Sequence, residues 1–190
     1  VAAQIILGTS AVFDKLLLRK RFTDPWAYTF WASVLALFIV VFIPFFGFYS
    51  IPLPTIFVGI AGGAISSLAL FFFFLALREG EASVALPVIG GLAPIFSLAL
   101  IYLFSGREET LRMQDFPAFI LLVSGSFLIT YQKSKKISLS SLKISILAAF
   151  FLALFFVLAR YVYLGQSFFQ GLIWISVGSF LGGLLLLLNK

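Results

Sequence analysis

Seven long runs of apolar residues, separated by short polar stretches, make up this chain. The runs lack the alternation of apolar and polar positions that lipid-facing strands need, so a β-barrel is disfavoured. About 20 apolar residues cross roughly 30 Å of hydrocarbon as a helix, which satisfies its own backbone hydrogen bonds. We therefore predict an all-α, multi-pass transmembrane helical bundle with seven spans, at residues 1–18, 26–49, 55–77, 84–104, 116–131, 144–164 and 167–188.

Lys and Arg side chains lie mostly in the connections between these runs. When the connections are assigned to alternate sides of the membrane, ten basic residues fall on one side and three on the other. Cytoplasmic loops carry the excess of Lys and Arg, so the first side would be cytoplasmic. The three on the opposite side are Arg107, Arg112 and Arg160.

The composition excludes a soluble domain. Hydrophobic residues make up 62% of the 190 residues and charged residues 11%, whereas about a quarter of a soluble domain is charged. The net charge of +6 does not indicate a nucleic-acid partner, because that needs a basic face on a soluble module. Lipid headgroups are the partner that basic loops between apolar runs favour.

Two residue types are absent, and their absence limits the chemistry. The chain has no Cys and no His, which removes thiolate nucleophiles, thiolate metal sites and the commonest acid–base group and metal ligand. We expect no metal site, no cofactor and no enzymatic activity.

Small residues recur at spacings of three or four in two of the runs. Such faces let two helix backbones approach closely. We predict a role in helix packing for Gly59, Gly63, Gly178 and Gly182. Ser66 and Ser67 share this pattern, and their hydroxyl groups can also serve as the polar lining of a substrate cavity.

The stretch ALPVIGGLAPIF at 85–96 is the most specific local feature. Pro94 has no N–H, so the carbonyl of Gly90 loses its helical partner. Gly90 and Gly91 let a backbone or a ligand approach closely. We expect a kinked helix that lines a substrate cavity with Gly90, Gly91 and Pro94; a kink that serves packing alone is the alternative.

Three ionisable residues lie inside the runs: Asp14, Lys15 and Arg160. Such residues are candidate functional sites by default. Lys15 and Arg160 lie near the ends of their runs, where their side chains can reach the headgroups. Asp14 is a candidate site for a proton or cation, or a partner for an arginine, with interfacial anchoring as the alternative.

Five short motifs follow one another in order between residues 76 and 131: Ala76-Leu77, Ala82-Ser83, Pro94, Gly106 and Gly125. This order resembles the second part of a repeat in the EamA-type family of the drug/metabolite transporter superfamily. Residues 12–20 also resemble the end of the first helix in some members. One departure is that Arg107 follows the turn glycine, and the acids come after it as Glu108 and Glu109.

The resemblance implies a ten-helix protein built from two inverted five-helix repeats. We expect a first repeat at 1–132, a basic inter-repeat loop at 133–143, and the first two helices of a second repeat at 144–190. The chain starts without Met and ends just after an apolar run, so we expect it to be part of a longer protein. The resemblance implies a cytoplasmic N-terminus, against the distribution of basic residues, so the orientation stays open.

In function, the resemblance implies a secondary transporter that moves a small organic metabolite by alternating access, in a bacterial-type inner membrane. Asp14 would be a coupling or gating charge. The implied partners are lipid, a small-molecule substrate, a proton or cation, and a second copy in a homodimer. The alternatives are a non-transporting partner subunit and a lipid-modifying membrane enzyme, which would have to use Glu108 and Glu109.

Overall fold

All the regular structure that is seen is helical. The computed structural model describes residues 8–10, 12–14, 16, 24–42, 51–105, 117, 119–121, 123–125, 128 and 139–189, and it shows no strand among them. The prediction of an all-α bundle is therefore confirmed. The helices are α2 (Pro25–Leu37), the 3-10 helix η1 (Phe38–Phe42), α4 (Leu53–Glu79), α5 (Ala82–Ser105), α7 (Leu139–Gly165) and α8 (Phe168–Leu188).

Four of these helices, α4, α5, α7 and α8, are long and apolar enough to cross a membrane. They match the third, fourth, sixth and seventh predicted spans. A shorter apolar stretch at Pro25–Val41 corresponds to the second. The first and fifth predicted spans lie mostly outside the described residues, so seven spans remains a prediction. Within those two, the described parts are helical.

A cap fixes the start of α2. The backbone N–H of Trp26 donates to Asp24 Oδ1 at 3.1 Å, which satisfies one of the four N–H groups that a helix start leaves open. Pro25 follows at the first helical position, where its missing N–H costs nothing. The Asp-Pro pair therefore places Tyr28 and Thr29 in the first turns of α2.

The start of α7 packs against the turn between α4 and α5. A Cβ at Gly80 would overlap the side-chain oxygen of Ser141, and Ser140 Oγ donates to Glu79 Oε2 at 3.0 Å. The helix begins at Leu139, ahead of the predicted start at 144. The prediction followed the apolar run alone, whereas these contacts extend the helix through a polar stretch.

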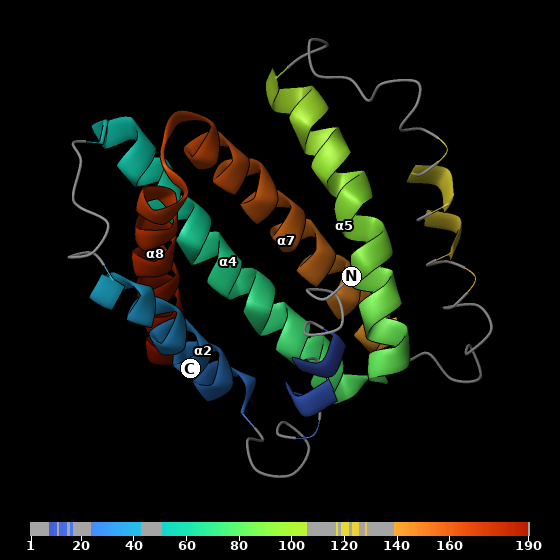
Figure 1. Cartoon of the computed structure of the whole chain (residues 1–190). Helices are drawn as coiled ribbons and strands as arrows, with labels where there is room; N and C mark the ends of the chain where they lie inside the picture. Colours follow the sequence, from blue (N-terminus) through green and yellow to red (C-terminus); the bar gives the residue numbers. More distant parts are fainter. Residues whose placement is uncertain are drawn as a thin grey trace.

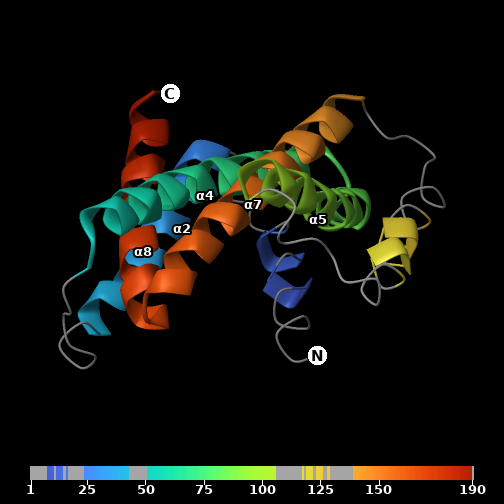
Figure 2. The same ribbon diagram turned by 90° about the horizontal axis from the view of Figure 1, so that it is seen from above.

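Helix α4 is the centre of the assembly. It packs on α7, α8 and α2, while α5 packs on the far side of α7. Figure 2 shows α8 and α2 at one end, α5 at the other, and α4 with α7 between them. Helices that follow one another in the chain, such as α7 and α8, contact each other less than they contact α4. The helices after residue 138 are thus interleaved with those before it.

The core where α4, α5 and α7 meet is built largely of alanine. Ala76, Ala85, Ala148 and Ala149 are at most 1% exposed, and Leu77 is fully buried. Small side chains let helix backbones approach closely in a membrane, where packing rather than water exclusion drives association.

The four glycines predicted to pack helices lie at the contact between α4 and α8. A Cβ at Gly63 would overlap the carbonyl oxygen of Ile175, and one at Gly178 would overlap that of Ile60. A Cβ at Gly182 would come within 2.7 Å of Ala64 Cα, and one at Gly59 within 3.0 Å of Trp174 Cβ. The backbones of α4 and α8 can therefore touch only because these positions carry no side chain.

Candidate functional site

A cavity of about 460 Å³ lies between the helices. The N-terminal segment, α2, α4, α5, α7 and α8 all contribute to its lining. The lining residues are Ser10, Asp14, Ala36, Ser66, Ala69, Leu70, Phe73, Phe74, Ile89, Ala148, Leu152, Phe155, Leu172, Ile175, Ser176 and Ser179. Its walls therefore combine elements that lie far apart along the chain.

The cavity lies near the middle of three spans. On α7 its residues run from 148 to 155, at the centre of the helix, and on α8 from 172 to 179, from its second turn to its midpoint. On α4 they run from 66 to 74, in the second half of that helix. Polar groups at such depth are costly unless they are paired or serve a function. The polar residues of this lining are therefore the candidates for function.

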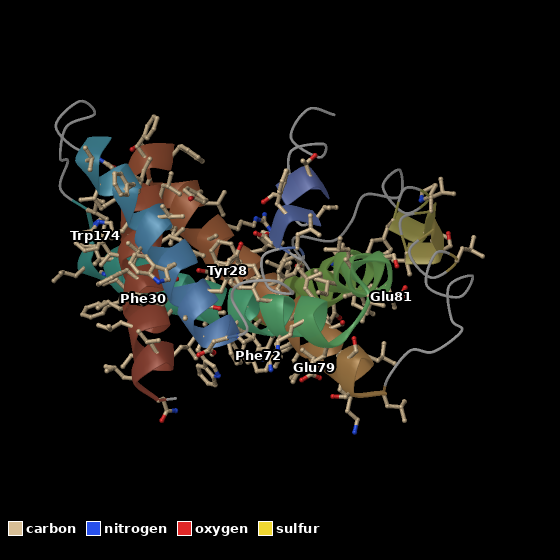
Figure 3. All side chains as sticks on the ribbon, turned by 90° about the horizontal axis from the view of Figure 1, so that it is seen from below. Tyr28, Phe30, Phe72, Glu79, Glu81 and Trp174 are labelled. Carbon is tan, nitrogen blue, oxygen red and sulfur yellow. The ribbon has the colours of Figure 1, made fainter. Side chains whose placement is uncertain are left out.

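Asp14 is held in place by Tyr28. The Tyr28 hydroxyl donates to Asp14 Oδ1 at 2.5 Å, a charge-assisted hydrogen bond when the carboxyl is ionised. The Tyr28 ring packs edge-on against Phe74, with 4.6 Å between the ring centroids, and Phe74 lines the cavity. Figure 3 shows Tyr28 on α2. Tyr28 thus positions the carboxylate without lining the cavity itself.

Ser66 and Ser67 are neighbours in the chain with different surroundings. Successive residues point about 100° apart on a helix. Ser66 lines the cavity, and its hydroxyl donates to the carbonyl of Gly63 in its own helix at 2.6 Å. Ser67 is fully buried and donates across to the carbonyl of Ser179 on α8 at 2.6 Å. Of the two predicted cavity serines, the structure places one in the lining.

The Pro and Gly residues of α5 lie outside this lining. The helix is continuous from Ala82 to Ser105 with both prolines inside it, and Ile89 is its contribution to the cavity. Gly90 is exposed, with nothing within 4 Å of a Cβ built there, and Gly91 is buried. The structure therefore does not bring Gly90, Gly91 or Pro94 together with Asp14 and Ser66.

Three buried hydroxyl groups meet where α2, α4 and α8 come together. The side-chain oxygens of Ser33 and Ser67 are 3.3 Å apart, and those of Ser67 and Ser179 are 3.1 Å apart. Ser33 also donates to the carbonyl of Thr29 at 3.0 Å. All three serines are at most 5% exposed. The serine cluster of Ser33, Ser67 and Ser179 thus ties α2 and α8 to α4 beside the cavity.

Replacing Ser67 by alanine should lower the stability of the protein by about 1 kcal/mol, because the hydrogen bond from its hydroxyl to the carbonyl of Ser179 on α8 is lost. Thermal unfolding of the purified protein in detergent micelles measures the loss. Ser66→Ala is the matched control, since its hydroxyl donates only within α4, and it should change the apparent Tm little. Equal losses for the two variants would contradict a role for Ser67 between helices.

The residues that surround Asp14 and the cavity were not all predicted from the sequence. Tyr28, Ser33, Ser176 and Ser179 were not among the predicted site residues. A signal was present, because polar residues inside an apolar span commonly make contacts between helices. Nothing in the sequence pairs residue 14 with residue 28.

Arg160, the other ionisable residue that the structure describes inside the predicted spans, lies elsewhere. It lines a second cavity of about 410 Å³ with Tyr161 and apolar residues of α4, α5 and α7. Lys15 lies outside the described residues. Among the residues that are described, no group of three or more His, Cys, Asp or Glu side chains comes together.

The comparison with protein families identifies the chain. A model described as the EamA-like transporter family matches residues 1–131. Comparisons with curated proteins and with solved structures found no match. The match covers more than half of the 190 residues and includes α2, α4 and α5. The chain therefore belongs to the EamA-like transporter family, as its sequence resemblance indicated, and is an integral, multi-pass membrane transporter of the drug/metabolite superfamily.

Proposed function

We propose that this protein is a secondary transporter that moves a small organic molecule through the Asp14 cavity by alternating access. The observation that carries the proposal is the lining itself, which lies near the middle of the spans and joins helices from both sides of the predicted repeat boundary. Transporters built from inverted repeats bind their substrates near the bilayer midplane, between the repeats.

The predicted division of the chain fits this proposal. Residues 1–132 would form the first repeat and supply Asp14 and Ser66, while residues 144–190 would supply Ser176 and Ser179. Rocking of one repeat against the other would then open the cavity to each side in turn. The two repeats would contact each other during this motion where α7 and α8 pack against α4.

Cysteine labelling tests alternating access directly, because the chain has no Cys of its own. Ser66→Cys and Ser176→Cys should each react with a membrane-impermeant maleimide added to intact cells, and also when it is added to inverted membrane vesicles. The thiolate is the reactive form and needs water around it, so reaction from a given side reports an open path from that side.

Ala61→Cys is the matched control for this labelling. Ala61 lies on the same helix but is exposed on the outside of the bundle, where lipid would keep a thiol from ionising. It should react from neither side. If the two cavity cysteines react from one side only, the cavity is a fixed vestibule and alternating access is wrong.

A further inference from the structure

The charge of the cavity lining selects among small organic molecules. Among its described lining residues, Asp14 is the one with an ionisable side chain, and none is Lys or Arg. Building on the proposed transport function, we propose that the ligands of this cavity are organic cations: apolar or aromatic amines whose ammonium group binds the Asp14 carboxylate.

The hydrogen-bonding groups of the lining also favour a cationic ligand. The single proton of the Ser66 hydroxyl is donated to Gly63, so Ser66 presents only acceptor lone pairs to the cavity. The Ser179 hydroxyl donates to Ser33 at 3.4 Å. A carboxylate accepts hydrogen bonds and donates none when it is ionised. The acceptors at Asp14 and Ser66 suit a ligand with several N–H donors, and an ammonium group has up to three.

Tyr28 forms a hydrogen bond with one of the two oxygens of the Asp14 carboxylate, and we assign the other oxygen to the ligand. Its hydroxyl occupies Oδ1, and the described residues provide no hydrogen-bond partner for Oδ2. Since Phe74 touches the Tyr28 ring and also lines the cavity, the held carboxylate lies beside an aromatic wall. An ammonium group on Oδ2 would thus lie close to a ring that attracts cations.

Apart from Ser10 and Ser176, the rest of the lining is apolar, and it favours a ligand with an apolar body. Phe73, Phe74 and Phe155 supply aromatic surface, and Leu70, Leu152 and Leu172 supply aliphatic surface. A carboxylate or phosphate of a ligand would find no cation among these residues, and burying an unpaired anion is costly. Anionic and zwitterionic metabolites are therefore disfavoured, while an amine with an apolar body pairs its charge and buries its carbon skeleton.

Equilibrium binding to the purified protein in detergent tests this inference with three probes of similar skeleton: phenethylamine, phenethyl alcohol and hydrocinnamate. By titration calorimetry the protein should bind the amine about tenfold or more tightly than the alcohol, and the acid least. Asp14→Asn should weaken amine binding by about tenfold to hundredfold and leave alcohol binding unchanged, which also shows that the cavity is intact.

Two further variants separate position from charge. Tyr28→Phe keeps the ring against Phe74 but frees Oδ1, and it should weaken amine binding less than Asp14→Asn does. Glu81→Gln removes a carboxylate at the turn between α4 and α5, outside the cavity lining. It should leave the affinity for the amine unchanged. If Glu81→Gln weakened amine binding as much as Asp14→Asn does, the assignment of the ammonium site to Asp14 would be overturned.

Other outcomes separate this inference from the proposed function. Equal affinity for amine and alcohol, or loss of both in Asp14→Asn, overturns the cation inference, whether or not the protein transports. Amine binding that depends on Asp14, without exchange of labelled amine across proteoliposomes, supports the cation site and overturns transport through it.

Discussion

Replacing Gly63 by alanine should lower the apparent Tm of the protein in detergent by about 6 to 12 °C. The added Cβ would overlap the carbonyl oxygen of Ile175 and come within 2.5 Å of the backbone nitrogen of Ser179. Both are backbone atoms of α8, which cannot rotate aside as a side chain can. Separating the helices loses packing worth about 3 kcal/mol, which gives that shift for a chain of this size.

Two other glycines provide graded controls for this experiment. A Cβ at Gly62 would lie 3.3 Å from Leu158 Cβ on α7, so Gly62→Ala should cost about 1 kcal/mol. At Gly90 a Cβ would meet nothing within 4 Å, so Gly90→Ala should be neutral or stabilise α5 by up to about 1 kcal/mol. A loss at Gly90 as large as that at Gly63 would show that helix propensity, not the α4–α8 contact, governs stability.

Replacing Ser66 by phenylalanine should reduce transport about tenfold or more. The side chain of residue 66 lines the cavity, and a benzyl group there would occupy the space that a ligand needs. Overpacking of this kind costs a ligand about 1 to 3 kcal/mol, and 1.4 kcal/mol corresponds to a factor of ten. Uptake into proteoliposomes of a phenethyl probe that the unmodified protein carries is the measurement.

Ala61→Phe is the matched control for Ser66→Phe. It adds a benzyl group to the same helix at a position exposed on the outside of the bundle, so uptake should be retained. Both variants should unfold near the temperature of the unmodified protein, which excludes misfolding as the cause. Retained uptake in Ser66→Phe would show that the ligand path avoids this cavity.

Helix α4 serves two purposes on two of its faces. Gly63 and Ser67 face α8, where a missing side chain and a hydrogen bond hold the helices together. Ser66 and Leu70 face the cavity. Substitutions on the first face should act mainly on stability and those on the second on transport. Substitutions of the neighbouring residues Ser66 and Ser67 therefore test transport and stability separately.

Much of the architecture could be predicted from the sequence, for a simple physical reason. A membrane span must be apolar along a helix length of about 20 residues, so α4, α5, α7 and α8 were visible as runs. Close helix contacts in lipid need small residues on one face, and Gly63 and Gly178 carried that signal. The family followed from the order of motifs between residues 76 and 131.

The start of α7 was harder to predict. Ser140 and Ser141 read as loop residues because they are polar. Their places in the helix depend on Glu79 and Gly80, which lie about 60 residues earlier in the chain. A local pattern contains no information on such a contact, and the predicted helix start was late for that reason.

The sequence by itself determined the all-α membrane bundle, the family, and the short set of polar and small residues inside the spans, because each of these depends on local composition or spacing. Only the tertiary structure decided which of those residues share a cavity. It placed Asp14 beside Tyr28, turned Ser66 inward and Ser67 toward α8, and left Gly90 on the outside. Those outcomes depend on how distant helices rotate and pack against one another, and side chains one residue apart on α4 therefore have different roles.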